Sequence, residues 1–134
     1  MKIIEDFPPN YAEITKTFDI DGKSIVFTYG DTIYNPRKAK IQPHLERHES
    51  IHWEQQQKYG GPEKWWERYL IDNKFRLEQE IEAYAAQYKF VQEEMAVPRQ
   101  AKRRFLLQIC KDVSGPIYGH CISFERAKQL ITNK

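Results

Sequence analysis

Apolar and polar residues alternate over much of residues 11–34, which is the spacing of strands whose side chains point to opposite faces. The apolar positions are Ile14, Phe18, Ile20, Ile25, Phe27 and Tyr29. Asp21-Gly22 is a strong hairpin signal between these runs, and Gly30-Asp31 supplies a second turn before residues 32–34. Asn35-Pro36 ends the pattern. We therefore predict a three-stranded antiparallel β-meander within residues 1–36.

From residue 43 onward the pattern changes to the spacing of helices. Pro43 suits the first turn of a helix that runs to about Tyr59 and ends at Gly60-Gly61. Pro62 begins a second helical stretch, which bends near Asp72-Asn73 and continues to about residue 94. These signals predict two long helical stretches in the middle of the chain.

Two more helices are expected near the C-terminus, starting at Pro98 and at Ser123, which is a suitable N-cap. Residues 114–121 form an irregular loop between them. The predicted fold class is α+β, with a small antiparallel three-stranded sheet followed by a mainly helical bundle in residues 43–134. A chain of 134 residues matches one domain, so we expect residues 1–134 to form a single domain.

Composition narrows the class of protein. Apolar residues make up 40% of the chain and charged residues 30%, which suits a packed interior under a solvated surface. The net charge of +2 is too small to argue for a nucleic-acid or anionic-membrane partner. No apolar run approaches a signal peptide or the ~18 residues of a membrane span, so we expect a cytoplasmic protein. Cys110 and Cys121 are then expected to be reduced core residues.

The helix predicted from residue 43 contains His48-Glu49-Ser50-Ile51-His52, an HExxH motif. Two histidines four residues apart lie about one turn from each other on one helical face, so both rings can reach one ion. Glu49 points about 100° away around the helix axis, where it can hold a water. The motif therefore predicts a catalytic metal site, against the alternative of two solvent-facing histidines on an ordinary helix.

A catalytic zinc needs a third protein ligand and an open position. Three carboxylates follow on the next helical stretch, at Glu78, Glu80 and Glu82. The apolar stripe of this stretch is formed by Leu77, Ile81, Tyr84, Ala85, Tyr88 and Val91. Glu78 and Glu80 flank the stripe, whereas Glu82 lies on the far side and should face solvent. Periodicity alone therefore leaves Glu80 or Glu78 as the third ligand.

The combination of HExxH with Glu80-Ile81-Glu82-Ala83-Tyr84 resembles the gluzincins, especially the short minigluzincin-like peptidases. In that group the third zinc ligand is a Glu three residues before an Ala on the helix after the motif helix. The resemblance covers about residues 32–87 and implies a zincin-like metallopeptidase domain with one Zn²⁺ per chain. It implies His48, His52 and Glu80 as the zinc ligands and Glu49 as the general base.

The chain departs from the family at Tyr84, where several gluzincins carry an acidic or amide residue that supports a metal-ligating His. His44 lies one turn before the motif and is interpreted as a neighbour of the ligands, because a fourth protein ligand would close the zinc. Gln55 and Gln56 are interpreted as solvated helix residues, although either could support a ligand. Clustered Trp65, Trp66 and Tyr69 are expected to be core residues, the alternative being a substrate pocket.

The loop at residues 114–121 gathers a phenol, an imidazole and a thiol, in Tyr118, His120 and Cys121. Tyr118 or His120 could donate to the oxyanion of a tetrahedral intermediate. Minigluzincin-like proteins have C-terminal segments that cover the cleft, so the resemblance also implies an autoinhibited form in which His120 or Cys121 ligates the zinc. The sequence leaves both alternatives open.

Together these features predict a zinc-dependent metalloendopeptidase that acts on a peptide or protein substrate. The substrate would lie extended beside an edge strand at residues 32–34. One alternative is a catalytically silent zinc-binding module of a phage or mobile element, whose fourth coordination position is occupied. The other is a nucleic-acid-associated regulator that uses the basic residues between Arg99 and Lys111, although the leading interpretation of that helix is an ordinary solvated face.

Overall fold

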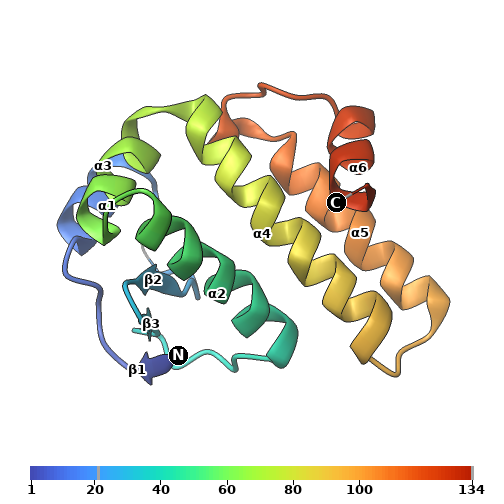
Figure 1. Cartoon of the computed structure of the whole chain (residues 1–134), viewed down its shortest axis with the longest axis horizontal. Helices are drawn as coiled ribbons and strands as arrows, with labels where there is room; N and C mark the ends of the chain where they lie inside the picture. Colours follow the sequence, from blue (N-terminus) through green and yellow to red (C-terminus); the bar gives the residue numbers. More distant parts are fainter. Residues whose placement is uncertain (21, 134) are drawn as a thin grey trace.

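The computed structural model describes residues 1–20 and 22–133, which form a small three-stranded sheet and a mostly helical remainder with six α-helices (Figure 1). The elements are β1 (Lys2–Ile4), α1 (Tyr11–Thr17), β2 (Phe27–Tyr29), β3 (Thr32–Tyr34), α2 (Pro43–Lys58), α3 (Pro62–Ile71), α4 (Asn73–Glu94), α5 (Arg99–Val113), the 3₁₀ helix η1 (Pro116–Tyr118) and α6 (Phe124–Thr132). No helix in the described part of the chain combines the length and the apolar character that a membrane span needs.

The sheet is mixed, so the prediction of a purely antiparallel meander is wrong. Its strand order is β1-β3-β2, with β3 in the centre. β2 and β3 form the predicted antiparallel hairpin, and Gly30 makes its turn with a φ of +64° that favours glycine. β1 pairs with β3 in parallel, with Ile3 opposite Ile33. The other predicted turn includes Asp21, which lies outside the described residues.

The first predicted strand is instead the helix α1. Ile14 and Phe18 are four residues apart, a spacing that fits both the two-residue period of a strand and the 3.6-residue period of a helix. Ile14 is buried on the inner side of α1, and the backbone N–H of Phe18 closes the last turn on the carbonyl of Ile14. The alternation seen in the sequence was therefore ambiguous, and packing selected the helix.

The helical predictions are confirmed closely. α2 begins at Pro43, and Ser123 caps α6 by accepting a hydrogen bond from the backbone N–H of Arg126. The bend expected near Asp72-Asn73 is a break between α3 and α4, because Asp72 caps α4 by accepting from the N–H of Phe75 at 3.0 Å. Capping at this position starts a new helix in a new direction.

α2 packs against α4 on one side and against β2 on the other, while α5 and α6 pack on α4 (Figure 1). Two apolar clusters follow from this arrangement. The N-terminal cluster comprises Ile14, Ile20, Phe27, Trp65, Trp66 and Phe75. The C-terminal cluster comprises Leu77, Ile81, Leu106, Ile109, Cys110, Val113, Tyr118, Ala127 and Ile131. α4 contributes to both clusters and presents its remaining buried face to α2.

Candidate metal centre

Packing of α2 on α4 brings two imidazoles and one carboxylate to a single point. The Nε2 atoms of His48 and His52 lie 3.1 Å apart. Oε1 of Glu80 lies 3.1 Å from Nε2 of His48, and Oε2 of Glu80 lies 3.1 Å from Nε2 of His52. All three residues are buried, with 4 to 5% exposure. The structure therefore brings together the HExxH histidines and one of the two carboxylates that periodicity left open.

The other two carboxylates considered from the sequence, Glu78 and Glu82, do not contact the imidazoles. Glu78 and Glu82 are both exposed, as periodicity predicted for Glu82. Glu82 still has a link to the centre, because its Oε1 accepts a hydrogen bond from Nε2 of Gln55 at 3.0 Å. Of the three, Glu80 alone contacts the two imidazoles in the described structure.

Glu49 lies beside the two imidazoles, but its carboxylate is hydrogen-bonded to the sheet. Its Oε1 accepts a hydrogen bond from the hydroxyl of Thr28 on β2 at 2.9 Å, and its Oε2 is 3.7 Å from Nε2 of His48. His48, Glu49 and His52 each offer a ligand atom within 4.8 Å of the others, so this group could hold a metal ion. Glu80 lies closer to both imidazoles than Glu49 does, and Thr28 binds Glu49 from β2.

Two buried glutamines determine which imidazole nitrogens are available to a metal. Nδ1 of His48 lies 2.9 Å from Oε1 of Gln87, and Nδ1 of His52 lies 2.8 Å from Oε1 of Gln55. An amide oxygen only accepts hydrogen bonds, so each Nδ1 carries its hydrogen, and in the neutral ring the lone pair is on Nε2. When both rings are neutral, the Nε2 atoms are thus the ones that could bind a metal ion, and they lie 3.1 Å apart.

Each glutamine is itself oriented by further contacts. Nε2 of Gln55 donates to the carbonyl of Gln79 at 2.9 Å, and Nε2 of Gln87 donates to Nδ1 of His44 at 2.8 Å. His44 thus lies behind Gln87 rather than among the proposed ligands. The interpretation of Gln55 as a solvated residue is wrong, because its exposure is only 6%.

Sequence reasoning missed Gln87. It lies seven residues after Glu80, two helical turns along the same face of α4, so periodicity could have indicated it. Tyr84 lies between them and packs its ring against His48, with ring centroids 4.5 Å apart. Position 84 thus carries no amide, and Gln87, one turn later, provides the amide that contacts His48.

The charges of the centre shift the pKa values of its members. Burial alone lowers the pKa of His52, but the charges of Glu80 and Glu49 and hydrogen bonds with Glu80 and Gln55 outweigh burial and raise it to about 9. Burial alone raises the pKa of Glu80, but the charge of His52 and hydrogen bonds from both imidazoles hold it well below its usual range. The hydroxyl of Tyr69 donates to Oε2 of Glu80 at 2.7 Å. Glu80 is therefore an ionised and oriented carboxylate.

Gln56 makes the next contact with the sheet and is wholly buried, which also corrects its interpretation as solvated. Its Oε1 accepts from the N–H of Gly30 at 2.7 Å, and its Nε2 donates to the carbonyl of Thr28 at 2.8 Å. The indole N–H of Trp66 donates to the same carbonyl at 2.9 Å. The side chains of Gln56 and Trp66 therefore occupy backbone groups at this edge of β2 that a neighbouring strand would otherwise bind. The predicted substrate edge at Thr32–Tyr34 is wrong, because β3 is the central strand.

A cavity of about 440 Å³ adjoins the centre. Its lining includes His48, Glu49, His52 and Glu80. Trp65 and Trp66 belong to the N-terminal cluster, as predicted, and line this cavity as well. Of the three loop residues singled out from the sequence, only Tyr118 lines the cavity.

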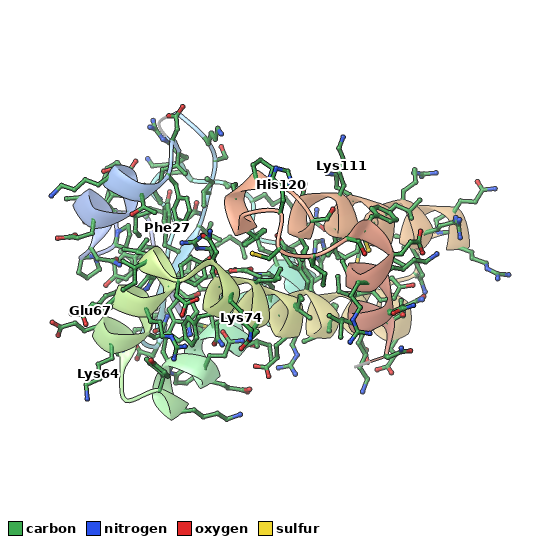
Figure 2. All side chains as sticks on the ribbon, turned by 90° about the horizontal axis from the view of Figure 1, so that it is seen from above. Phe27, Lys64, Glu67, Lys74, Lys111 and His120 are labelled. Carbon is green, nitrogen blue, oxygen red and sulfur yellow. The ribbon has the colours of Figure 1, made fainter. Side chains whose placement is uncertain are left out.

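The structure does not bring His120 or Cys121 to the centre. Both are exposed; His120 contacts the carbonyl of Ser114 through Nδ1, and Figure 2 shows it at the outer edge of the molecule. Cys110 is buried in the C-terminal cluster. Neither cysteine therefore lies beside His48, Glu49 and His52 in this structure.

Comparisons with known proteins give no match, since no family model, no curated protein and no solved structure matches this chain. The chemistry of the centre must therefore be inferred from its own geometry.

Proposed function

We propose that this chain is a zinc-dependent peptidase, in which His48, His52 and Glu80 bind the metal and Glu49 is the general base. The observation that carries the proposal is the convergence of two Nε2 atoms and one carboxylate at mutual distances of 3.1 Å, beside a second carboxylate held on a strand. Neither a solvated helix face nor an apolar core explains four buried ionisable residues at one point.

The donor set fits zinc. Two imidazole nitrogens and one carboxylate oxygen are a common catalytic set, and bonds of about 2.0 to 2.1 Å in a tetrahedral site separate the ligand atoms by about 3.3 Å. The measured separations of 3.1 Å are close to this value. The amides of Gln87 and Gln55 supply the outer hydrogen bonds that metal-ligating histidines need.

When bound, zinc supplies a Lewis acid that acidifies a water and polarises the scissile carbonyl. Glu49 accepts the proton of the attacking water and passes it to the leaving amine, which requires a carboxylate that keeps a fixed position. The hydroxyl of Thr28 provides that position from β2. Glu49 thus has the contacts of a general base rather than those of a third ligand.

Tyr118 is the better candidate for stabilising the oxyanion, because it lines the cavity and His120 does not. Burial, with the nearby charge of Glu80, raises the pKa of Tyr118 well above its usual range. The phenol therefore keeps its proton at neutral pH and can donate it in a hydrogen bond to developing negative charge.

Residues 24–26 are the best position for an extended substrate backbone. Ser24, Ile25 and Val26 line the cavity and lead into β2, which begins at Phe27. Hydrogen-bonding directions alternate along a strand, so Val26, if extended by pairing with a substrate, would present its peptide groups on the same side as those of Thr28. Since Gln56 and Trp66 already occupy the carbonyl of Thr28, a substrate would pair only with the residues before it.

The decisive variant is Glu49→Gln, because the amide keeps the shape of the side chain but cannot accept the proton. We expect zinc to remain bound and cleavage of a mixed peptide library to fall by a factor on the order of 10² to 10⁴. Glu54→Gln, at an exposed position of α2, is the control and should cleave as the parent does. Equal cleavage by the parent and by Glu49→Gln would exclude the proposal.

The near-complete burial of the centre favours one second candidate, a silent zinc-binding module. His48, Glu49, His52 and Glu80 are each only 4 to 6% exposed, and η1 places Tyr118 over the cavity that adjoins them. An autoinhibited enzyme, in which Tyr118 covers the cleft instead of stabilising the oxyanion, has the same appearance, but it should gain activity when the chain is cut before Ser114, provided that circular dichroism shows an intact fold. A folded, zinc-loaded protein that is inert in both forms would be the silent module.

A further inference from the structure

The cavity beside the candidate centre has two chemically different parts. The four ionisable residues of the centre form one part of the lining. The apolar part includes Ile14, Phe18, Ile20, Ile25, Val26, Phe27, Leu45 and Ile117, together with Ala39, Trp65 and Trp66. The first six of these come from α1 and from the chain that follows it into β2, and Phe27 lies on the inner side of α1 (Figure 2). The N-terminal part of the chain thus forms a compartment that the metal centre does not need for its own construction.

Among the described residues that line the cavity, His48, Glu49, His52 and Glu80 are the only Asp, Glu, His, Lys or Arg residues, and all four belong to the centre. An ammonium or carboxylate group inserted into the apolar part would lose its hydration without gaining a partner there. The compartment therefore selects against charged groups.

Size and access suit a large side chain. A volume of about 440 Å³ is within the range of ligand pockets and exceeds what a small side chain fills. Ile14 is 2% exposed, whereas Ser24 is exposed and Ile117 is 53% exposed. The lining therefore reaches the surface at Ser24 and at Ile117, and Ser24 belongs to the segment beside which a substrate backbone is expected.

We propose that this apolar compartment binds a large uncharged side chain of the peptide substrate, next to the bond that is cleaved, and that Ile25 determines this preference at the rim. The proposal rests on the peptidase function inferred above. An apolar pocket discriminates about 10- to 200-fold for a single methylene, so the kcat/KM for a large apolar side chain should exceed that for a charged one by at least about tenfold. Peptides with Phe or Leu beside the scissile bond should therefore be cleaved faster than matched peptides with Asp or Lys.

Ile25→Asp tests the assignment directly, because Ile25 is only half-buried and the fold should accept a carboxylate there. We expect the preference of this variant to shift from Phe toward Lys by at least tenfold. Ile3→Asp is the matched control, since Ile3 is exposed on β1 and does not line the cavity. An unchanged preference in a folded Ile25→Asp protein would overturn the proposal.

Binding without catalysis separates this proposal from the peptidase function. Methyl-labelled isoleucines in the zinc-loaded Glu49→Gln protein are titrated with N-acetyl-phenylalanine amide, and in parallel with the Lys and Asp amides. We expect the Phe amide to shift the methyl signals of Ile14, Ile25 and Ile117, and the charged amides to shift them at least tenfold less. Selective shifts in this variant, together with a parent protein that cleaves no peptide, would keep the compartment and reject the peptidase. Cleavage without any preference, or no selective shifts, would reject the compartment alone.

Discussion

α4 serves two regions that were built in opposite ways. One face places Leu77 and Ile81 in the C-terminal cluster, where the buried partners from α5 and α6 are also apolar. The other face places Glu80 and Gln87 against α2, where the buried partners are the polar residues His48 and His52. One helix therefore supports an apolar core on one side and a charged centre on the other.

The difference between the two regions points to function. Burying apolar side chains stabilises the fold by roughly 25 cal/mol for each Å² removed from water. A buried ion pair gains little or nothing over apolar residues of the same volume, because the desolvation of both charges offsets their attraction. The C-terminal cluster is thus explained by stability, whereas the arrangement around Glu80 is better explained by a ligand.

Truncation in the C-terminal cluster should give the largest effect on stability and none on metal binding. Leu106→Ala removes a side chain that is 6% exposed, so we expect the free energy of unfolding to fall by about 2 to 5 kcal/mol. Chemical denaturation measures this loss, and zinc analysis of the folded protein should match the parent. Loss of zinc from a protein that is still folded would show that the two faces of α4 are not independent.

Substitution of the two buried glutamines should weaken zinc binding and change the stability of the fold less than Leu106→Ala does. Gln87→Leu and Gln55→Leu each remove the acceptor for one Nδ1, and we expect zinc affinity to fall by about 10- to 100-fold in each variant. Competition with a zinc chelator measures the affinity. Gln57→Leu, at an exposed position of α2, serves as the control. Equal affinities in all four proteins would mean that the amides do not orient metal ligands.

Zinc binding should also depend on pH, with an effect of at most tenfold for each pH unit. The pKa of His52 is raised to about 9 in the absence of metal, so near pH 7 its imidazole carries a proton that zinc must displace. The protonated form stabilises the fold without zinc below pH about 6.5, and this contribution is lost as the pH rises through about 9. Zinc affinity should rise over the same interval.

Calorimetry in buffers with different ionisation enthalpies counts the protons that zinc displaces. We expect about one proton for each zinc near pH 7, attributable to His52. Binding without proton release would contradict the charge state assigned to this imidazole.

Local signals in the sequence were enough for the helical part of the fold. Pro43, Pro98 and Ser123 mark helix starts through backbone chemistry that depends on few neighbours, and the structure confirms them. The sheet depends on contacts between distant segments. β1 is three residues long, too short to show a period, and its parallel partner lies 30 positions away at Thr32–Tyr34. Such pairing leaves no trace in the local pattern.

The candidate centre likewise combines features that are local in the sequence with contacts between distant segments. HExxH and the periodicity of the following helix are properties of single helices, so the sequence was sufficient to single out the motif and to narrow the third ligand to Glu80 or Glu78. The contacts of Gln87 and Thr28 depend on how α4 and β2 pack against α2, and the sequence analysis did not anticipate them. The apolar compartment was missed because α1 was predicted to be a strand.

Zinc content measured after dialysis against metal-free buffer tests the central claim most directly. We expect about one zinc for each chain in the parent protein, none in His48→Ala, and a strong loss in Glu80→Gln, since a direct ligand should contribute at least as much as an outer contact. Glu78→Gln, at an exposed position of the same helix, should retain the zinc of the parent. A parent without zinc, or a loss in Glu78→Gln with none in Glu80→Gln, would contradict the assignment of His48, His52 and Glu80 as the metal ligands.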